Sequence, residues 1–282
     1  MKFAGFPKFA LLLAPAVVFI VALAGCGSSN NLALTQGNWS VAATSTSGPV
    51  HQSLDGKTIS PNATNVSFYV GGNLTQSGTT VAGTMYFVGT CLNPSLAVNF
   101  TGTVKGTTVT LTSANLEGTT ITVTATGTTA ASTSSLTGTY SISGSACDSS
   151  GTVTASAVVP ITGTWNGTLT NCTDGPLGCA PATISIALTQ AATPSSDGTF
   201  ALTGPVTYTN SVCSANGTIS AGSVSGLFVH LNDAPNDTGS FDYSYALLDS
   251  ASAPANMTGT YVDGNDSQNC AGNQETVTLT KQ

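Results

Sequence analysis

The chain of 282 residues has little charge and no arginine. Only 6% of its residues are charged, and five lysines stand against twelve acidic residues. A surface for nucleic acid is therefore excluded, because binding to phosphates needs clustered basic side chains. Electrostatic attraction to anionic lipid headgroups is excluded for the same reason.

Groups for acid–base or nucleophilic catalysis are equally scarce. The chain has only two histidines, His51 and His230, and a serine or cysteine nucleophile needs a nearby base. No Gly-x-Ser-x-Gly motif occurs, since Gly222–Gly226 carries Val224 at its centre. Two distant histidines also make no zinc site. We therefore expect a protein that is not an enzyme and has no resident cofactor.

One apolar run lies near the start of the chain. It extends from Phe9 to Val21, follows Lys2 and Lys8, and is interrupted by Pro15. A membrane-spanning helix needs roughly 20 apolar residues, so the shorter run favours a secretory signal over a transmembrane anchor.

The run ends in Leu23-Ala24-Gly25-Cys26, which resembles the lipobox of bacterial lipoproteins. The resemblance implies that Cys26 is acylated and becomes the N-terminus after cleavage. Residues 1–25 would then be a signal peptide and residues 26–35 a flexible tether. Gly27 stands where an aspartate would direct retention in the inner membrane of enterobacteria, so the resemblance favours a cell-envelope location at the outer membrane. The processed chain would carry three lysines against twelve acids.

The rest of the chain is an internal repeat. Gly37-Asn38-Trp39-Ser40 recurs as Gly163-Thr164-Trp165-Asn166, 126 residues later. Leu136-Thr137-Gly138-Thr139-Tyr140 recurs as Met257-Thr258-Gly259-Thr260-Tyr261, 121 residues later. Such self-similarity indicates duplicated units. We predict two domains, residues 36–158 and 159–282.

Beyond Cys26 there are six cysteines, an even number that in an exported chain predicts three disulfides. Cys91 and Cys147 are 56 residues apart, and Cys213 and Cys270 are 57 apart, in register with the repeat. We therefore predict disulfides that join these two pairs and a local third. The three predicted pairs are Cys91–Cys147, Cys213–Cys270 and Cys172–Cys179.

Both copies alternate apolar residues with threonine, as in 108–112 and 120–124, which is typical of antiparallel strands with one wet face. Turn residues separate about eight such segments in each copy. In the second copy the strands are expected at 161–170, 182–190, 199–208, 214–221, 224–231, 239–248, 256–262 and 274–281.

The fold class predicted is all-β, with two tandem antiparallel meanders of about eight strands that close into barrels and so leave no open edges. The Gly-x-Trp segment and the Leu-Thr-Gly-Thr-Tyr strand resemble elements of lipocalin-like and avidin-like barrels. The alternative is a pair of immunoglobulin-like sandwiches, although their tryptophan between the cysteines is missing here. Trp39 and Trp165 are expected to pack as plugs at one end of each barrel.

A meander places alternate turns at the same end of the domain. In the second copy this gathers the four cysteines and five acidic residues: Asp174, Asp233, Asp237, Asp263 and Asp266. Such a rim offers the oxygen ligands that calcium prefers, although no complete calcium-binding loop is present. The alternative is that aspartate is simply frequent in turns and keeps the protein soluble. Paired carboxylates of a glycosidase are a third reading, and the least supported.

Two functions from different classes remain. A lipid-anchored binding module would recognise a protein, a polysaccharide or a small ligand, and predicts a cavity or an exposed aromatic cluster. Its candidate residues, Phe241, Tyr243 and Tyr245, share one face of a strand, with core packing as their alternative role. A structural envelope spacer predicts filled barrel interiors and no ligand. We favour the binding module.

Overall fold

The computed structural model describes all of the chain except residues 1–30, 48–66, 91–92, 117, 131, 145–147, 174–181, 212–215, 236–241 and 263–273. The described residues form strands, turns and connecting segments. No helix among them is long and apolar enough to cross a membrane.

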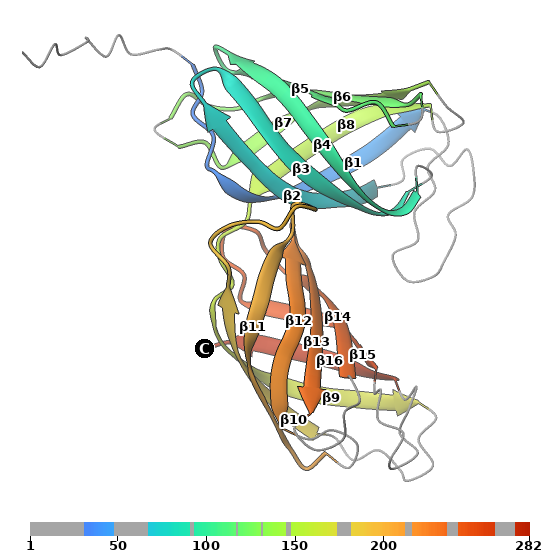
Figure 1. The fold of residues 1–282 in the computed structure, drawn as a ribbon, viewed down its shortest axis with the longest axis vertical. Coiled ribbons are helices and arrows are strands. Elements are labelled where there is room, and N and C mark those ends of the chain that lie inside the picture. The colour runs from blue at the N-terminus through green and yellow to red at the C-terminus, as the bar shows by residue number, and fades with distance from the viewer. Residues whose placement is uncertain are drawn as a thin grey trace, which may run out of the picture.

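The first eight strands pair in chain order and close into an antiparallel barrel, because β1 pairs with both β2 and β8 (Figure 1). These strands are β1 (Gly37–Ser47), β2 (Ser67–Ser77), β3 (Thr80–Thr90), β4 (Asn93–Lys105), β5 (Thr108–Ser113), β6 (Thr120–Thr126), β7 (Ser135–Ser143) and β8 (Ser149–Ala157).

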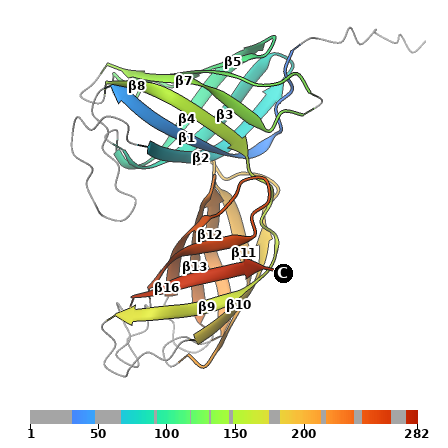
Figure 2. The ribbon, with the colours of Figure 1, turned by 180° about the vertical axis from the view of Figure 1, so that it is seen from behind.

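The second eight strands repeat this arrangement, with β9 paired to both β10 and β16 (Figure 2). They are β9 (Gly163–Thr173), β10 (Ala182–Gln190), β11 (Phe200–Thr209), β12 (Gly217–Ser225), β13 (Phe228–Pro235), β14 (Asp242–Leu248), β15 (Asn256–Val262) and β16 (Gln274–Lys281). The predicted fold class, two tandem antiparallel barrels of eight strands, is confirmed.

Alternation of small polar and aliphatic residues builds these strands. In β5, Val109 and Leu111 are buried, whereas Thr108, Thr110 and Thr112 alternate with them and face outward. Two-residue turns join neighbouring strands at Gly78 and Gly106, whose φ angles of +60° and +59° favour glycine. The period-two pattern thus sets both the buried face and the register.

Each barrel has its own apolar core with a fully buried tryptophan. Trp39 and Trp165 both have 0% of their surface exposed. The indole nitrogen of Trp39 donates to the carbonyl of Thr35 at 2.8 Å, and that of Trp165 donates to the carbonyl of Ile161 at 2.9 Å. The buried N–H groups are therefore satisfied, and both tryptophans pack as the sequence predicts.

The segment before β1 is part of the first barrel. Leu32 and Leu34 are 1% and 7% exposed and belong to its core. The Leu32 amide donates to the carbonyl of Gly106 at 2.8 Å, and the Leu34 amide donates to the side chain of Gln76 at 2.7 Å. Residues 31–35, which were expected in the flexible tether, therefore lie against the barrel. They do so because Leu32 and Leu34 are buried in its apolar core.

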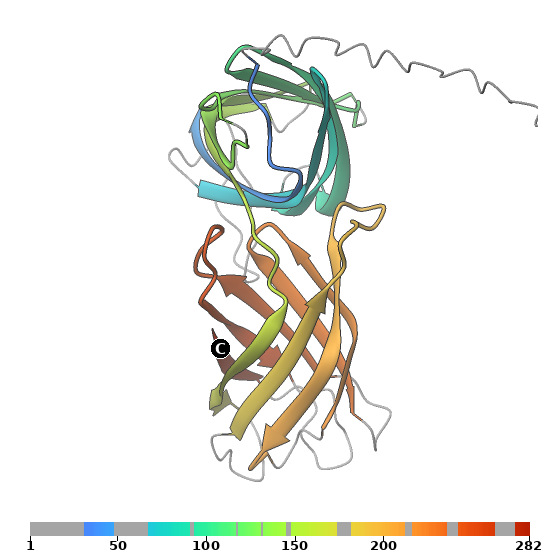
Figure 3. The same ribbon diagram turned by 90° about the vertical axis from the view of Figure 1, so that its left-hand side faces the viewer.

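The two barrels contact each other through the turn between β12 and β13, and Gly198 of the connection between β10 and β11 lies against Thr84 of β3. The turn between β12 and β13 lies on the outer face of β1 and β2, as the views in Figures 1 and 3 show. A β-carbon on Gly71 would overlap the backbone of Ser225 and Gly226, so glycine is required for this approach. Tyr69 of β2 and Phe228 of β13 pack edge to face, with ring centroids 6.5 Å apart.

Asn38 joins the barrels by two hydrogen bonds to one residue. Its Nδ2 donates to the carbonyl of Gly226 at 3.1 Å, and the Gly226 amide donates to its Oδ1 at 2.7 Å. Asn38 is 5% exposed, whereas Thr164, at the matching position of the second barrel, is exposed. The contact between barrels therefore accounts for this difference between the two copies.

Candidate functional site

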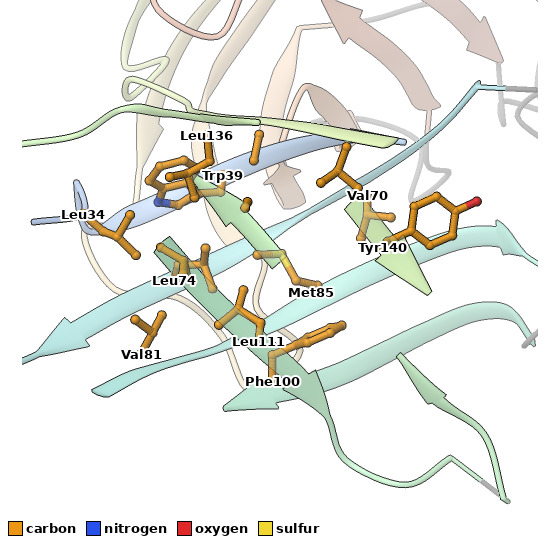
Figure 4. Close-up of a cluster of buried hydrophobic side chains, with 14 of the residues drawn as sticks. Leu34, Trp39, Val70, Leu74, Val81, Met85, Phe100, Leu111, Leu136 and Tyr140 are labelled. Carbon is orange, nitrogen blue, oxygen red and sulfur yellow. The ribbon is translucent and has the colours of Figure 1, made fainter. Parts of the chain in front are cut away.

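The interior of the first barrel contains an apolar cavity of about 60 Å³. Seventeen side chains from all eight strands line it, and none of them is charged. Figure 4 shows several of these side chains, among them Leu74, Met85, Phe100 and Tyr140, pointing into the barrel from different strands. An apolar space of this kind is a site for an apolar ligand, because water inside it would find no hydrogen-bond partners.

Small side chains contribute to this cavity. Ala43 lies on its wall, four residues after Trp39, whereas the residue four positions after Trp165 is Leu169, which is 1% exposed in the second core. The register supports the equivalence, because Ala43 pairs with Val153 and Leu169 pairs with Val277. The first barrel therefore has an alanine where the second has a leucine.

One end of the first barrel is closed by the segment that precedes β1. Gln76 accepts from the Leu34 amide through Oε1 and donates from Nε2 to the carbonyl of Leu32 at 3.0 Å. Gln190 accepts in the same way from the amide of Ile161 in the second barrel, at 2.9 Å. In each barrel, a glutamine near the end of the second strand thus binds the segment that precedes the first strand and holds it near the buried tryptophan.

The opposite end of the cavity carries three buried hydroxyl groups. The Tyr140 hydroxyl lies 2.9 Å from Ser149 Oγ, which lies 3.3 Å from Ser45 Oγ. Ser45 and Ser149 are 0% and 6% exposed. Tyr140 lines the cavity, so this hydroxyl cluster borders an otherwise apolar space.

The second barrel has a carboxyl group on its inner face. Glu275 lies on the same face of β16 as Val277 and Leu279, and its position pairs with that of the buried Tyr261. Partial burial raises the pKa of Glu275. The folded state therefore binds this proton more tightly than the unfolded chain does.

We expect Glu275→Gln to stabilise the protein at neutral pH. The pKa of Glu275 is higher in the folded state than its ordinary value of 4.5. The contribution of Glu275 to the stability of the folded state is therefore complete below pH 4.5 and is lost as the pH rises through the folded-state pKa. The variant and the parent should therefore unfold at similar urea concentrations at pH below 4, and the variant at a higher one at pH 7. Equal midpoints at pH 7 would contradict this assignment.

Asp249→Asn provides a control of opposite sign. Hydrogen bonds from the backbone and side chain of Asn256, with a further one from the Ala255 amide, lower the pKa of Asp249. The contribution of Asp249 to the stability of the folded state is therefore present above its unfolded-state pKa and is lost as the pH falls through its folded-state pKa. This variant should be less stable than the parent at pH 7.

His230 lies on the outer side of β13, because Val229 and Leu231 on either side of it are buried. Partial burial lowers its pKa. Its position pairs with Ser223 of β12 and with Tyr245 of β14. Neither of these two paired residues is an acid.

The candidate aromatic residues lie on or beside β14. Tyr243 and Tyr245 pair with Asn232 and His230, on the face opposite to that of the buried Ala246 and Leu248. Their backbone positions therefore belong to the outer face of the second barrel. Their side chains, and Phe241 as a whole, lie outside the described part of the chain.

The candidate calcium ligands and the predicted disulfides also fall outside the description. Asp174, Asp237, Asp263 and Asp266 are not described, and for Asp233 only the backbone is, in β13. The same holds for the cysteines, of which only Cys172 has a described backbone, in β9. Within the described residues, no three acidic, histidine or cysteine side chains converge as metal ligands would.

The fold defines an all-β protein of two tandem closed antiparallel barrels. No protein-family model matches the chain, and no curated protein matches it. One similar solved structure is the crystal structure of a double mutant of the vaccine antigen transferrin binding protein B from Haemophilus parasuis Hp5. The two chains are 9% identical with a TM-score of 0.22, over 90% of this chain and 77% of that one.

Proposed function

We propose that this protein is a non-catalytic lipoprotein of the bacterial cell envelope whose first barrel binds a small apolar ligand. The observation that carries the binding role is the apolar cavity of about 60 Å³ inside that barrel. A structural spacer needs no such space, because a filled barrel interior is more stable than one with a cavity. The scarcity of histidine and the absence of a convergent metal site among the described residues support a non-catalytic role.

The anchoring part of the proposal rests on the sequence Leu23-Ala24-Gly25-Cys26. From Cys26 to Asn31, where the described chain begins, five residues span at most about 18 Å when extended. An acylated Cys26 would therefore hold the first barrel close to the membrane surface. We propose the outer membrane as that location and residues 1–25 as the cleaved signal peptide.

Cys26→Ser tests the anchor. We expect cells that express the parent protein to incorporate radiolabelled palmitate into it and to retain it in the membrane fraction. The serine variant should incorporate no label, because only the thiol is acylated, and should lose its membrane association. Equal labelling of parent and variant would contradict acylation at this residue.

Xenon tests whether the cavity accepts a ligand. Xenon NMR of the non-acylated Cys26→Ser protein should show a saturable shift, because an apolar cavity takes up this atom. Adding Ala43→Leu, which introduces the residue of the second barrel, should abolish the shift by filling the space. The same exchange at Ala97, on the outer side of β4, is the matched control and should leave it unchanged. A shift that does not saturate would overturn the binding role.

A further inference from the structure

The outer face of β5, β6 and β7 carries only hydroxyl side chains. Alternate residues of these strands face the core, and each residue between them that faces outward is a threonine or a serine. The three strands contain no charged residue. The outward residues, which together form the threonine face, are Thr108, Thr110, Thr112, Thr120, Thr122, Thr124, Thr126, Ser135, Thr137, Thr139, Ser141 and Ser143.

Such a face is not a requirement of the repeat. The corresponding strands of the second barrel are β13, β14 and β15, the fifth to seventh strands of that copy. Their outer face includes Phe228 and His230 on β13 and Leu247 on β14, which is 41% exposed. The threonine face is therefore a property of the first barrel alone.

The segment that leads back to Cys26 leaves the first barrel beside the threonine face. The Gly106 amide donates to Oδ1 of Asn31 at 2.7 Å, and Gly106 lies in the turn between β4 and β5. From this turn the segment crosses the end of the barrel to β1, as its blue trace in Figure 3 shows. The second barrel contacts β1, β2 and β3, and in a ring of eight strands β5, β6 and β7 lie opposite these. The threonine face is therefore turned away from the second barrel.

A membrane that holds Cys26 lies within reach of this face. Five residue steps separate Cys26 from Asn31 and span at most about 18 Å. The row of the threonine face nearest to the turn consists of Thr108, Thr126 and Thr137, which are paired across the three strands. Two strand spacings make this row about 10 Å wide. A tether of this length therefore keeps the row close to the bilayer surface.

The distribution of charge favours the same orientation. Nine of the twelve acidic residues lie in residues 159–282, which form the second barrel. Lys105 is exposed at the end of β4, beside the exit of the chain, and pairs with Thr108. An anionic leaflet therefore repels the second barrel and does not repel the threonine face. Threonine and serine hydroxyls can also donate hydrogen bonds to the phosphate and ester oxygens of lipid headgroups.

We propose that the threonine face is the surface with which the first barrel lies on the lipid headgroups of the membrane. The second barrel is then held on the far side of the first, away from the bilayer. The partner of this surface is an anionic lipid leaflet, which the hydroxyl groups contact without charge repulsion. This inference rests on the proposed acylation of Cys26.

Energy transfer from tryptophan to a labelled lipid headgroup tests the orientation. The acylated protein, purified from expressing cells, is placed in vesicles of equal parts phosphatidylethanolamine and phosphatidylglycerol that contain dansyl-labelled phosphatidylethanolamine. Trp165→Phe leaves Trp39 as the donor in the first barrel, and Trp39→Phe leaves Trp165 as the donor in the second. Transfer from Trp39 should be at least about twofold more efficient, because the first barrel lies between the anionic bilayer and the second barrel.

Negative charge on the threonine face should lift it from the bilayer. Thr137→Glu with Thr139→Glu places two exposed carboxylates against anionic headgroups and should lower the transfer from Trp39 at least about twofold. High salt should restore the transfer, because it screens the repulsion. Thr258→Glu with Thr260→Glu is the matched control, because both residues are exposed at the same positions of the repeated strand in the second barrel. The control should leave the transfer unchanged, as should Thr137→Gln with Thr139→Gln.

A second pair of substitutions covers a failure of folding. Thermal unfolding of the Cys26→Ser forms identifies a glutamate pair that does not fold, and Thr124→Glu with Thr126→Glu on β6 then takes its place. These two threonines are exposed on the same face, so the expected loss of transfer and its recovery at high salt are the same.

The outcomes separate this inference from the proposed anchor. Protein that incorporates no palmitate and does not remain with the vesicles would overturn the anchor, and the inference with it. Anchored protein with equal transfer from both tryptophans would overturn the orientation and leave the anchor standing. Unchanged transfer in the folded glutamate pairs of the threonine face would overturn this face as the contact with lipid.

Discussion

Gly71→Ser is expected to loosen the contact between the two barrels while leaving each of them folded. Any β-carbon at this position would overlap the backbone of Ser225 and Gly226, which cannot move away without the whole turn between β12 and β13. The turn should therefore leave the face of β1 and β2. In the described part of the chain, the linker at 158–162 and the approach of Gly198 to Thr84 of β3 then still join the barrels. Backbone nitrogen relaxation should then show two barrels that tumble more independently of each other than in the parent, which tumbles as one body.

The second barrel supplies a matched control for this experiment. By the pairing of β10 with β9, Ser185 lies opposite Asn166, as Gly71 lies opposite Ser40 in the first barrel. Ser185→Gly exchanges the same two residues in the other direction on a face that no barrel covers, and should leave the tumbling unchanged. If Gly71→Ser tumbles like the parent, the glycine is not required for the contact between barrels.

Asn38 indicates how the duplicated units became different. Its side-chain amide pairs with both the backbone N–H and the carbonyl of Gly226 in a buried position, where an unpaired backbone group costs about 1–3 kcal/mol. Ser40 beside it is 7% exposed, whereas the matching Asn166 is exposed. The outward-facing residues of β1 therefore contact the second barrel, whereas the matching residues of β9 face solvent.

Most strands could be predicted from the sequence because local alternation determines them. The strands observed at Ala182–Gln190, Asn256–Val262 and Gln274–Lys281 coincide with the predicted ranges 182–190, 256–262 and 274–281. Their alternating residues face either the core or solvent, so the period of two identifies them without any knowledge of the rest of the fold.

The strands β12 and β13 begin and end three or four residues later than the predicted ranges 214–221 and 224–231. The prediction put a turn at Gly222-Ser223, but both residues lie within β12, where the register shifts between Ile219 and Ser223. The actual turn is at Gly226-Leu227, with φ of +58° at the glycine. Its contact with Asn38 is a tertiary interaction, which local propensity does not contain.

The cavity was missed because its signal is the smallness of inward-facing residues. Charged and aromatic residues are the usual signs of a ligand site in a sequence, and an alanine in a strand is neither. Comparison of the two copies position by position would have exposed the difference between Ala43 and Leu169. The acidic and aromatic candidates of the second copy remain predictions, since their side chains lie outside the described residues.

Trp39→Ala is expected to destabilise the first barrel by about 3–5 kcal/mol, which is a large part of the stability of a domain of this size. Trp39 is 0% exposed, and the alanine would leave a void beside Leu34 and Leu136 in the same core and an unpaired carbonyl at Thr35. Urea unfolding followed by circular dichroism should show the transition of the first barrel at a much lower concentration than in the parent.

The same variant reports on the second barrel without any added label. Trp165 is then the single tryptophan, and its fluorescence should follow a transition close to that of the parent, because its core belongs to the second barrel alone. Trp39→Phe serves as the milder control, since the ring keeps most of the packing and loses the indole hydrogen bond. Trp165→Ala should reverse the roles, with Trp39 reporting an unperturbed first barrel. If Trp39→Ala shifts both transitions equally, the contact through Asn38 and Gly71 couples the barrels into one folding unit, and their independent cores do not define their stability.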